Sequence, residues 1–318
     1  MKILVTGGAG FIGTHLIETL LEHEITILDN FSNSSIDEIP NFEQKNIKVI
    51  QDDIINLNQI KNSSLFFDLV IHLAAQINVD VSITNPEFNH KVNVIGTKNV
   101  LDFCVKNNIQ NFIAASSAAI FGEPEKLPLT ENSLANPISP YGESKLLMEE
   151  LIKDYSNKFN LNTIVLRFFN IYGKGQSDEY AGVISKFIKQ IRQNEDLVIF
   201  GDGNQTRDFL SVGDLTAAIN CAIKKINHKR GLCINIGSGK STTINELATL
   251  MISLSKKDLK IKYEIRKKGD IQNSLTSVSC AQKSLNFNPK ISLKNGIDKL
   301  LEFWKNIKPL FSVKLIWV

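Results

Sequence analysis

Tyr141 and Lys145 are four residues apart in the segment Tyr-Gly-Glu-Ser-Lys. On a helix, the two side chains lie on one face, roughly 40° apart around the axis. An ammonium about 4–6 Å from a phenol supplies on the order of 3–4 kcal/mol at an effective dielectric constant of about 20. With the positive charge of an oxidised nicotinamide, this is enough to bring the pKa of a phenol from about 10 to roughly 7. The pair predicts a general base, although the same spacing is also common on surface helices.

A glycine-rich turn between a strand and a helix predicts the nicotinamide site. Residues 2–6 are expected to form a short buried strand, and an amphipathic helix follows the turn. Gly7 and Gly10 allow backbone N–H groups to approach a pyrophosphate, and Gly13 allows close packing of helix on strand. The second strand ends at Asp29, whose carboxylate is suited to bind ribose hydroxyls and repels a 2′-phosphate. This frame favours NAD over NADP.

The alternation of apolar strands with helices continues and predicts an α/β fold with a doubly wound, Rossmann-type parallel sheet. We expect further strands at 47–50, 68–73 and 112–115, and a helix from about 85 to 106. In such a sheet the carboxyl ends of the strands form the ligand crevice.

Residues at these strand ends are candidates for cofactor contacts. Asp53 and Ile54 are expected at the adenine edge. Ala74 and Ala75 are small, so a cofactor is able to lie against the backbone there. Asn93 is a poor helix former inside a predicted helix. It is expected to hydrogen-bond either the cofactor or a neighbouring loop, and both alternatives stay open.

A hydroxyl and a proline-rich loop bring further chemistry to Tyr141. Ser117 follows the strand at 112–115, and Pro140 suits the first turn of a helix. We therefore expect Ser117 and Tyr141 on the crevice side. His72 follows an apolar run and is predicted to be a packed core histidine rather than a base.

The second half of the chain offers one candidate for anion binding. Arg207 lies in the turn-rich segment Gly-Asp-Gly-Asn-Gln-Thr-Arg-Asp-Phe at 201–209, after a predicted strand at 197–200. A guanidinium binds a diphosphate in a bidentate manner, so a nucleotide sugar is a natural partner. A surface pairing of Arg207 with Asp208 is the structural alternative.

Taken together, these segments resemble the extended short-chain dehydrogenase/reductase superfamily. Within it they are most similar to nucleotide-sugar 4-epimerases of the UDP-glucose/UDP-galactose type. The resemblance covers essentially the whole chain. The matching segments are GGAGFIG at 7–13, LDNFS at 28–32, DDI at 52–54, HLAAQ at 72–76, NVIGT at 93–97, SSAAIFG at 116–122, PYGESK at 140–145 and RFFNIYG at 167–173.

The resemblance implies a mechanism and the remaining site residues. Tyr141 would remove the proton from the sugar C4 hydroxyl, with Ser117 sharing the hydrogen bond and Lys145 holding the nicotinamide ribose. Hydride transfer to NAD would give a 4-keto sugar that turns over in the pocket before the hydride returns. Arg207 would contact the UDP phosphates, with Val198 and Phe200 along the uracil. The implied cofactor set is completed by Phe11, Ile12, Asn30, Leu73 and Phe168, and the substrate set by Asn170, Val183 and Asp270.

Two alanines narrow the chemistry within this superfamily. Dehydratases carry an acid pair just after the strand-end hydroxyl, and decarboxylating members carry a similar glutamate. Here the positions hold Ala118 and Ala119. Asp29 opposes the NADPH-dependent reductases. A dehydratase, decarboxylase or reductase therefore remains a minor alternative, as does a non-catalytic NAD-binding scaffold.

Two departures from the family pattern affect the substrate side. Lys267 occupies the place of a second phosphate-binding arginine, so either Lys267 or Arg266 is expected to bind the diphosphate. Ser274 occupies a position where a bulky tyrosine accompanies plain hexoses in the family. The small side chain predicts that UDP-GlcNAc and UDP-GalNAc are accepted alongside UDP-Glc and UDP-Gal.

The composition is ordinary for a globular protein. The chain has 318 residues, of which 43% are hydrophobic and 22% charged, and its net charge of +3 does not favour nucleic acid. No apolar run has membrane-spanning length, no signal peptide is expected, and the four scattered cysteines argue against a metal site, so we expect a cytoplasmic protein.

The sequence also predicts how the chain is divided. We expect an NAD-binding domain at 1–167 with return segments at about 212–236, and a nucleotide-sugar-binding domain at 168–211 and 237–318. Family resemblance further suggests a homodimer through the helices near 85–106 and 141–157.

Overall fold

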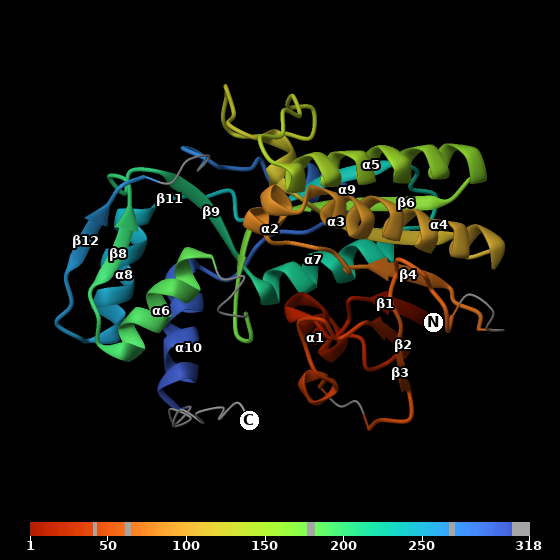
Figure 1. Ribbon diagram of the computed structural model, residues 1–318, viewed down its shortest axis with the longest axis horizontal. Helices are drawn as coiled ribbons and strands as arrows, with labels where there is room; N and C mark the ends of the chain where they lie inside the picture. Colours follow the sequence, from red (N-terminus) through yellow and green to blue (C-terminus); the bar gives the residue numbers. More distant parts are fainter. Residues whose placement is uncertain (41–42, 61–64, 177–181, 267–270, 307–318) are drawn as a thin grey trace.

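The structure, a computed structural model, describes residues 1–40, 43–60, 65–176, 182–266 and 271–306 (Figure 1). Its centre is a seven-stranded sheet in which every pairing is parallel. In spatial order the strands are β3 (Ile47–Gln51), β2 (Glu24–Asp29), β1 (Lys2–Thr6), β4 (Leu69–His72), β5 (Asn111–Ser117), β6 (Asn162–Phe168) and β10 (Leu232–Ile236). The predicted doubly wound parallel sheet is confirmed.

The chain reverses its direction of travel across the sheet between β1 and β4. From β1 it moves outward through β2 to β3, and it then crosses back to β4 and continues through β5 and β6 to β10. Adjacent carboxyl ends at such a reversal leave a crevice, because the connections leave the sheet in opposite directions. The ligand site is therefore expected above the ends of β1 and β4.

Helices cover both faces of the sheet (Figure 1). One core lies under α1 (Phe11–Glu18), α7 (Val212–Lys225) and α9 (Ser279–Leu285). The other lies under α4 (Thr97–Lys106) and α5 (Pro140–Phe159), to which α2 (Val79–Thr84) and α3 (Pro86–His90) are attached. As predicted, the strand near 233–236 returns to the cofactor sheet.

The predicted helix at 85–106 is present but not uniform. Asn85 caps α3, and a π-helical turn, η2 (Lys91–Gly96), joins α3 to α4. A Cβ atom at Gly96 would lie 2.6 Å from Cδ1 of Ile54, so glycine lets this helix pack closely on the Ile54 side chain. The sequence pattern gives no sign of the π turn.

A smaller unit packs beside the carboxyl ends of the main sheet. It contains a three-stranded sheet, a parallel pair of strands and three helices around their own hydrophobic core. The elements are β7 (Asn170–Tyr172), β9 (Thr206–Ser211) and β11 (Ser241–Thr243), then β8 (Leu197–Phe200) and β12 (Ile261–Glu264), and finally α6 (Val183–Gln193), α8 (Ile244–Ser255) and α10 (Leu293–Asn306). Two short helical turns, η1 (Ile36–Glu38) and η3 (Ala118–Phe121), complete the description.

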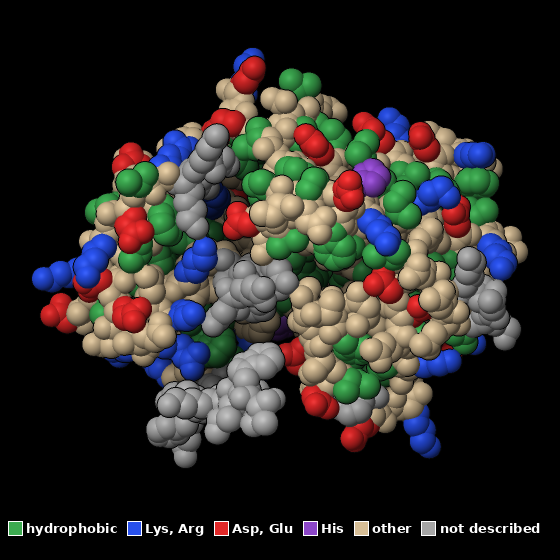
Figure 2. Space-filling model, in the orientation of Figure 1, with side chains coloured by type: hydrophobic (Ala, Val, Ile, Leu, Met, Phe, Trp, Pro, Cys, Tyr) green, Lys and Arg blue, Asp and Glu red, His purple; other side chains and the backbone are tan. Residues whose placement is uncertain are grey.

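Acidic and basic side chains are interspersed over the face shown in Figure 2. Within the described part of the chain, no helix is both long and apolar enough to cross a membrane. The residue boundaries of the two domains stay a prediction, although α9, from the segment expected in the substrate domain, packs against α7 and β10.

Candidate active site

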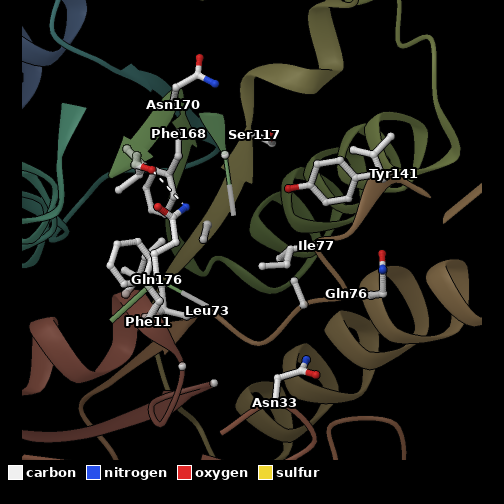
Figure 3. Close-up of a pocket in the computed structure, with 18 of the residues that line it drawn as sticks. Phe11, Asn33, Leu73, Gln76, Ile77, Ser117, Tyr141, Phe168, Asn170 and Gln176 are labelled. Atoms are coloured by element: carbon white, nitrogen blue, oxygen red, sulfur yellow. Dashed lines mark hydrogen bonds between the residues drawn. The ribbon is translucent and has the colours of Figure 1, made fainter. Parts of the chain in front are cut away.

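A cavity of about 1310 Å³ lies above the carboxyl ends of the central strands and extends to the smaller unit (Figure 3). Sites for a single drug-sized ligand typically have volumes of about 300–1,000 Å³. The cavity is larger, and its walls come from both β1–α1 and β8–β9. It therefore has room for a dinucleotide and a second ligand at the same time.

The glycine turn forms one end of this cavity. Gly7 has φ of +69°, and a Cβ atom there would lie 2.5 Å from the backbone nitrogen of Ala74. A Cβ atom at Gly13 would lie 2.5 Å from the carbonyl oxygen of Gly7. All these neighbours are backbone atoms that cannot move aside, which confirms that the turn and its packing require glycine. Gly10, Phe11 and Ile12 complete the rim.

Asp29 closes the adenosine side of the cavity. Its two carboxylate oxygens accept hydrogen bonds from the backbone N–H groups of Ala9, at 3.0 Å, and Phe31, at 2.9 Å. Burial raises the pKa of Asp29, while these bonds oppose the rise. The backbone of Asn30 also bonds the Asp29 carboxylate, which has about four acceptor positions, so acceptor capacity remains for a ribose hydroxyl. The donor set and the shape of the turn fit NAD.

Asn30 and Asp53, predicted separately, lie together at the same end. Asn30 Nδ2 donates to Asp53 Oδ2 at 3.0 Å, and Asp53 Oδ1 accepts from the backbone of Ile55 at 2.8 Å. Both side chains line the cavity, as do Ile54 and the strand-end residues Leu73, Ala74 and Ala75.

Asn93 corrects one predicted cofactor contact. It is fully buried and is not among the described residues that line the cavity. Its Oδ1 accepts from the backbone N–H of Gln76, and its Nδ2 donates to Gln76 O, Asn89 Oδ1 and Ser144 Oγ. Of the two alternatives left open by the sequence, the structure contains the loop contact. Asn93 therefore supports the segment at 73–76 from behind.

His72 is the packed core histidine that the sequence predicts. It is buried between the hydroxyls of Thr6, at 2.7 Å from Nδ1, and Thr97, at 2.9 Å from Nε2. Burial, with a smaller contribution from the charge of Lys145, lowers the pKa of His72 to about 3. The ring is neutral at physiological pH and does not face the cavity.

Tyr141 is brought to Ser117 by the way α5 begins. Ser139 caps the helix by accepting from the backbone of Gly142 at 3.1 Å, and Pro140 stands in the first turn, as predicted. A Cβ atom at Gly142 would lie 2.6 Å from the carbonyl oxygen of Ala119. Only glycine lets the helix start against η3, the turn that follows Ser117. The phenol of Tyr141 points into the cavity (Figure 3).

The electrostatics of Tyr141, Ser117 and Lys145 differ from the prediction in one respect, which is the pKa of the Tyr141 phenol. Burial raises the pKa of Tyr141, and a hydrogen bond with Ser117 only partly offsets the rise. Lys145 Nζ donates to the carbonyl oxygen of Ala115 at 3.0 Å, and burial lowers the pKa of Lys145 to about 8. The chain by itself does not lower the pKa of the phenol. The predicted activation therefore depends on the positive charge of an oxidised nicotinamide.

The smaller unit supplies the opposite wall. The predicted substrate residues Asn170, Val183, Val198, Phe200 and Arg207 all line the cavity, together with the predicted cofactor residue Phe168. Arg207 Nη1 donates to the carbonyl oxygen of Thr206 at 2.8 Å.

Asp208, next to Arg207 on β9, is fully buried. Its carboxylate accepts from Ser238 N and Oγ, both at 2.6 Å, from Gly239 N at 3.0 Å and from Thr276 N at 3.2 Å. Neighbouring side chains of a strand point to opposite faces. The acid therefore secures loops on one face, while the arginine lines the cavity on the other.

Ser274 corrects a second prediction. It is only 8% exposed and is absent from the described residues of the cavity wall. The reason is that Leu129 N donates to Leu275 O at 2.8 Å and Leu129 forms a bridge with Thr276, which holds this segment against the loop near residue 129. Lys267 and Asp270 lie outside the described residues, so their predicted contacts stay predictions.

The sequence pattern also missed several residues of the cavity. Gln76 and Ile77 line it directly after Ala75 (Figure 3), and extending the strand-end rule by two residues would have found them. Gln176 lines it as well and accepts from Ser185 Oγ at 3.0 Å, but no local signal marks it. Within the described ranges, no group of three or more His, Cys, Asp or Glu side chains could hold a metal ion.

Comparison with known proteins agrees with this site. A family model described as "NAD dependent epimerase/dehydratase family" matches residues 3–237. A protein of Methanocaldococcus jannaschii named "Putative UDP-glucose 4-epimerase" is 39% identical over 313 residues, which are 96% of this chain and 98% of the relative.

Two solved structures show the same fold. A UDP-glucose 4-epimerase of Thermotoga maritima with UDP-glucose has a TM-score of 0.90 and 33% identity, covering 96% of this chain and 99% of that one. A UDP-N-acetylglucosamine 4-epimerase of Methanobrevibacter ruminantium in complex with UDP-N-acetylmuramic acid has a TM-score of 0.90 and 31% identity, covering 96% and 98%. The chain belongs to the NAD-dependent epimerase/dehydratase family, and NAD is its cofactor.

Proposed function

We propose that the chain is an NAD-dependent UDP-hexose 4-epimerase that interconverts UDP-Glc and UDP-Gal and also accepts UDP-GlcNAc and UDP-GalNAc. The observation that carries the proposal is the hydrogen-bonded pair of Tyr141 and Ser117 in the same cavity as Arg207. A base and a diphosphate-binding group in one cavity suit a sugar nucleotide whose reacting hydroxyl is on the sugar.

In the proposed reaction, Tyr141 accepts the proton of the C4 hydroxyl, and Ser117 donates a hydrogen bond to the same oxygen. Bound NAD supplies a hydride acceptor at C4 that is regenerated when the hydride returns, so there is no net redox change. Lys145 holds the nicotinamide ribose. In the reverse step, Tyr141 returns the proton to the oxygen of the 4-keto sugar, after the sugar has presented its other face.

Inversion at C4 requires the sugar to turn while the nucleotide stays bound. Arg207 is proposed to hold the diphosphate, with Val198 and Phe200 against the base, so that only the sugar moves. The size of the cavity, about 1310 Å³, supports this freedom.

The N-acetylated substrates now rest on different support. Ser274 is not in the described wall and no longer argues for them. They are supported by cavity size and by similarity to a protein named as a UDP-N-acetylglucosamine 4-epimerase.

A dehydratase reaction is disfavoured by the residues beside Ser117. It requires an acid to protonate the departing hydroxyl, and the positions that carry one in dehydratases hold Ala118 and Ala119 in η3. Ala119 contributes only a backbone N–H, which donates to Ser117 Oγ at 3.1 Å.

The test is incubation of purified protein with each of the four UDP-sugars, without added reductant, followed by separation of the C4 epimers. Tyr141→Phe is the matched control, because it removes only the phenolic oxygen. A requirement for stoichiometric NADH, or bound NAD with no sugar-dependent change in absorbance, would refute the epimerase proposal. Turnover of only the non-acetylated pair would refute the wider substrate range, and a UDP-glucuronate sample tests a competing sugar.

We also propose that the chain forms a homodimer through the face of α3, η2 and α5. Ile95 of η2 and Leu147 of α5 are exposed apolar side chains that do not line the cavity. Multi-angle light scattering of the wild type and Leu147→Glu tests this, and a monomeric wild type would refute it.

A further inference from the structure

Three side chains of α5 meet three successive residues of β5. Tyr141, Lys145 and Glu149 are spaced by four residues and therefore share one face of the helix. Ser117 hydrogen-bonds the side chain of Tyr141, Ala115 O accepts from Lys145 Nζ at 3.0 Å, and Ser116 Oγ donates to Glu149 Oε1 at 2.5 Å. The helix is thus held to the strand through the same face that carries the proposed base.

The buried carboxylate of Glu149 is fixed by hydrogen bonds and an ion pair. It is 5% exposed. Arg167 Nε lies 3.0 and 3.1 Å from its two carboxylate oxygens, and Nη2 lies 2.8 Å from Oε2. Arg167 itself donates to Glu131 O at 3.1 Å and lies over the ring of Phe121, 5.3 Å from its centroid. The donors from Ser116 and Arg167 hold both carboxylate oxygens, which keeps the negative charge in one place.

The buried ion pair of Glu149 and Arg167 is not explained by its contribution to stability alone. Burying two charges costs several kcal/mol each, and apolar residues of similar volume are often equally stabilising. The position of the negative charge is more informative. Glu149 lies one helical turn from Lys145, whose side chain is only 3% exposed and whose ammonium is therefore disfavoured by burial.

We propose that Glu149 is a positioning residue for the epimerase reaction: its negative charge keeps Lys145 protonated and seated against Ala115 O. The inference rests on the proposed function for its catalytic consequence, but not for the charge state of Lys145. A charged Lys145 directs its N–H groups at Ala115 and at the cavity, where the nicotinamide ribose and the phenol of Tyr141 require a donor and a positive charge.

The other ionisable groups around Lys145 do not replace Glu149. Tyr141 shares α5 with it and is neutral until it loses its proton. His72, on β4, is neutral because burial lowers its pKa to about 3. Arg167, on β6, is positive and opposes the charge on Lys145. The negative charge of Glu149 favours the protonated form of Lys145. It therefore offsets part of the lowering of the Lys145 pKa by burial.

The test is a pH titration of Lys145 in the NAD-loaded protein, in wild type and in Glu149→Gln. Lysine labelled with ¹³C at Cε reports the charge by NMR, and Lys145→Arg identifies the signal. Glutamine keeps the acceptor for Ser116 and loses the charge. We expect the midpoint of Lys145 to fall, because the variant loses the negative charge, one helical turn away, that opposes the effect of burial.

The alkaline limb of the kcat profile should move to lower pH by the same amount. A merely structural role would lower kcat evenly at all pH values and leave the midpoint of Lys145 unchanged, which would overturn the proposal. The NMR titration needs no sugar, so it answers the question even if the epimerase proposal fails.

Glu149→Leu combined with Arg167→Met protects the test against misfolding, because an apolar pair replaces both charges. Lys145 should again titrate at lower pH than in the wild type. Asp214→Asn is the matched control. It removes another buried carboxylate, one that accepts from the backbone of Lys290 and Ile291, and it should leave the midpoint of Lys145 in place.

Discussion

Acidification should destabilise the protein through His72 in a way that can be calculated. The hydrogen bonds around the ring define one direction of donation. Thr97 Oγ1 donates its single proton to Asn93 O, at 2.7 Å, so it must accept from His72 Nε2–H. Nδ1 then carries no proton and accepts from the hydroxyl of Thr6. A second proton on the ring would force the Thr6 hydroxyl to turn from donor to acceptor, so its own proton would lose its acceptor on Nδ1.

The magnitude follows from the difference between the folded and unfolded states. The pKa of His72 falls from 6.5 to about 3 in the folded protein. Between these values the unfolded state binds more protons, so stability rises with pH and is lost as pH falls through 6.5 towards 3. From pH 8 to pH 4.5, this group alone should lower the free energy of unfolding by about 3 kcal/mol.

The assay is urea unfolding of the wild type and His72→Gln at pH 8 and pH 4.5. Glutamine cannot take up a proton, so the difference in unfolding free energy between the two proteins should shrink by about 3 kcal/mol on acidification. His90→Gln, at an exposed histidine of α3, is the control and should show no such change. A difference between wild type and His72→Gln that stays constant with pH would refute the reasoning.

Three further outcomes are expected. Tyr141→Phe should lower kcat for epimerisation by about 10²–10⁴-fold, while calorimetry shows unchanged NAD affinity; retained turnover would contradict the assigned base. Asp29→Asn should reduce the preference for NAD over NADP, measured as the two dissociation constants, because it removes the charge that repels a 2′-phosphate. An unchanged preference would contradict this. Asn93→Leu leaves the backbone N–H and C=O of Gln76 without their partner, so it should lower the free energy of unfolding by about 2–4 kcal/mol in urea; a smaller loss than in Asn89→Leu would argue against its support of the segment at 73–76.

Much of the central sheet could be predicted because its signals are local. Each strand of the cofactor half is a short apolar run, and the turn at Gly7 and the acid at Asp29 follow at fixed positions. The elements that were missed lack such a run. β9 contains Arg207 and Asp208, and β11 has only the three polar residues Ser241–Thr243. They are strands because they pair with each other.

The residues of the candidate site also divide into those with a local sequence signal and those without one. Residues at strand ends, such as Ala74 and Ser117, were predicted correctly because a parallel sheet gathers its carboxyl ends at one edge. Asn93 and Ser274 depended on distant partners. The segment at 274–276 is held by Leu129, 147 residues from Thr276. No local pattern reports a contact of that kind.

The bonds of Asp208 have a consequence for how new specificities could be built into this scaffold. The chain leaves this carboxylate at Gly239 and returns to it at Thr276. Between these points lie β11, α8 and β12, which all belong to the smaller unit. The stretch at 240–275 is thus an insert whose two ends are tied to one atom group. A replacement taken from a relative would enter and leave at the same place, provided that it keeps the contacts of Leu275 with Leu129 and of Gln272 with Glu123.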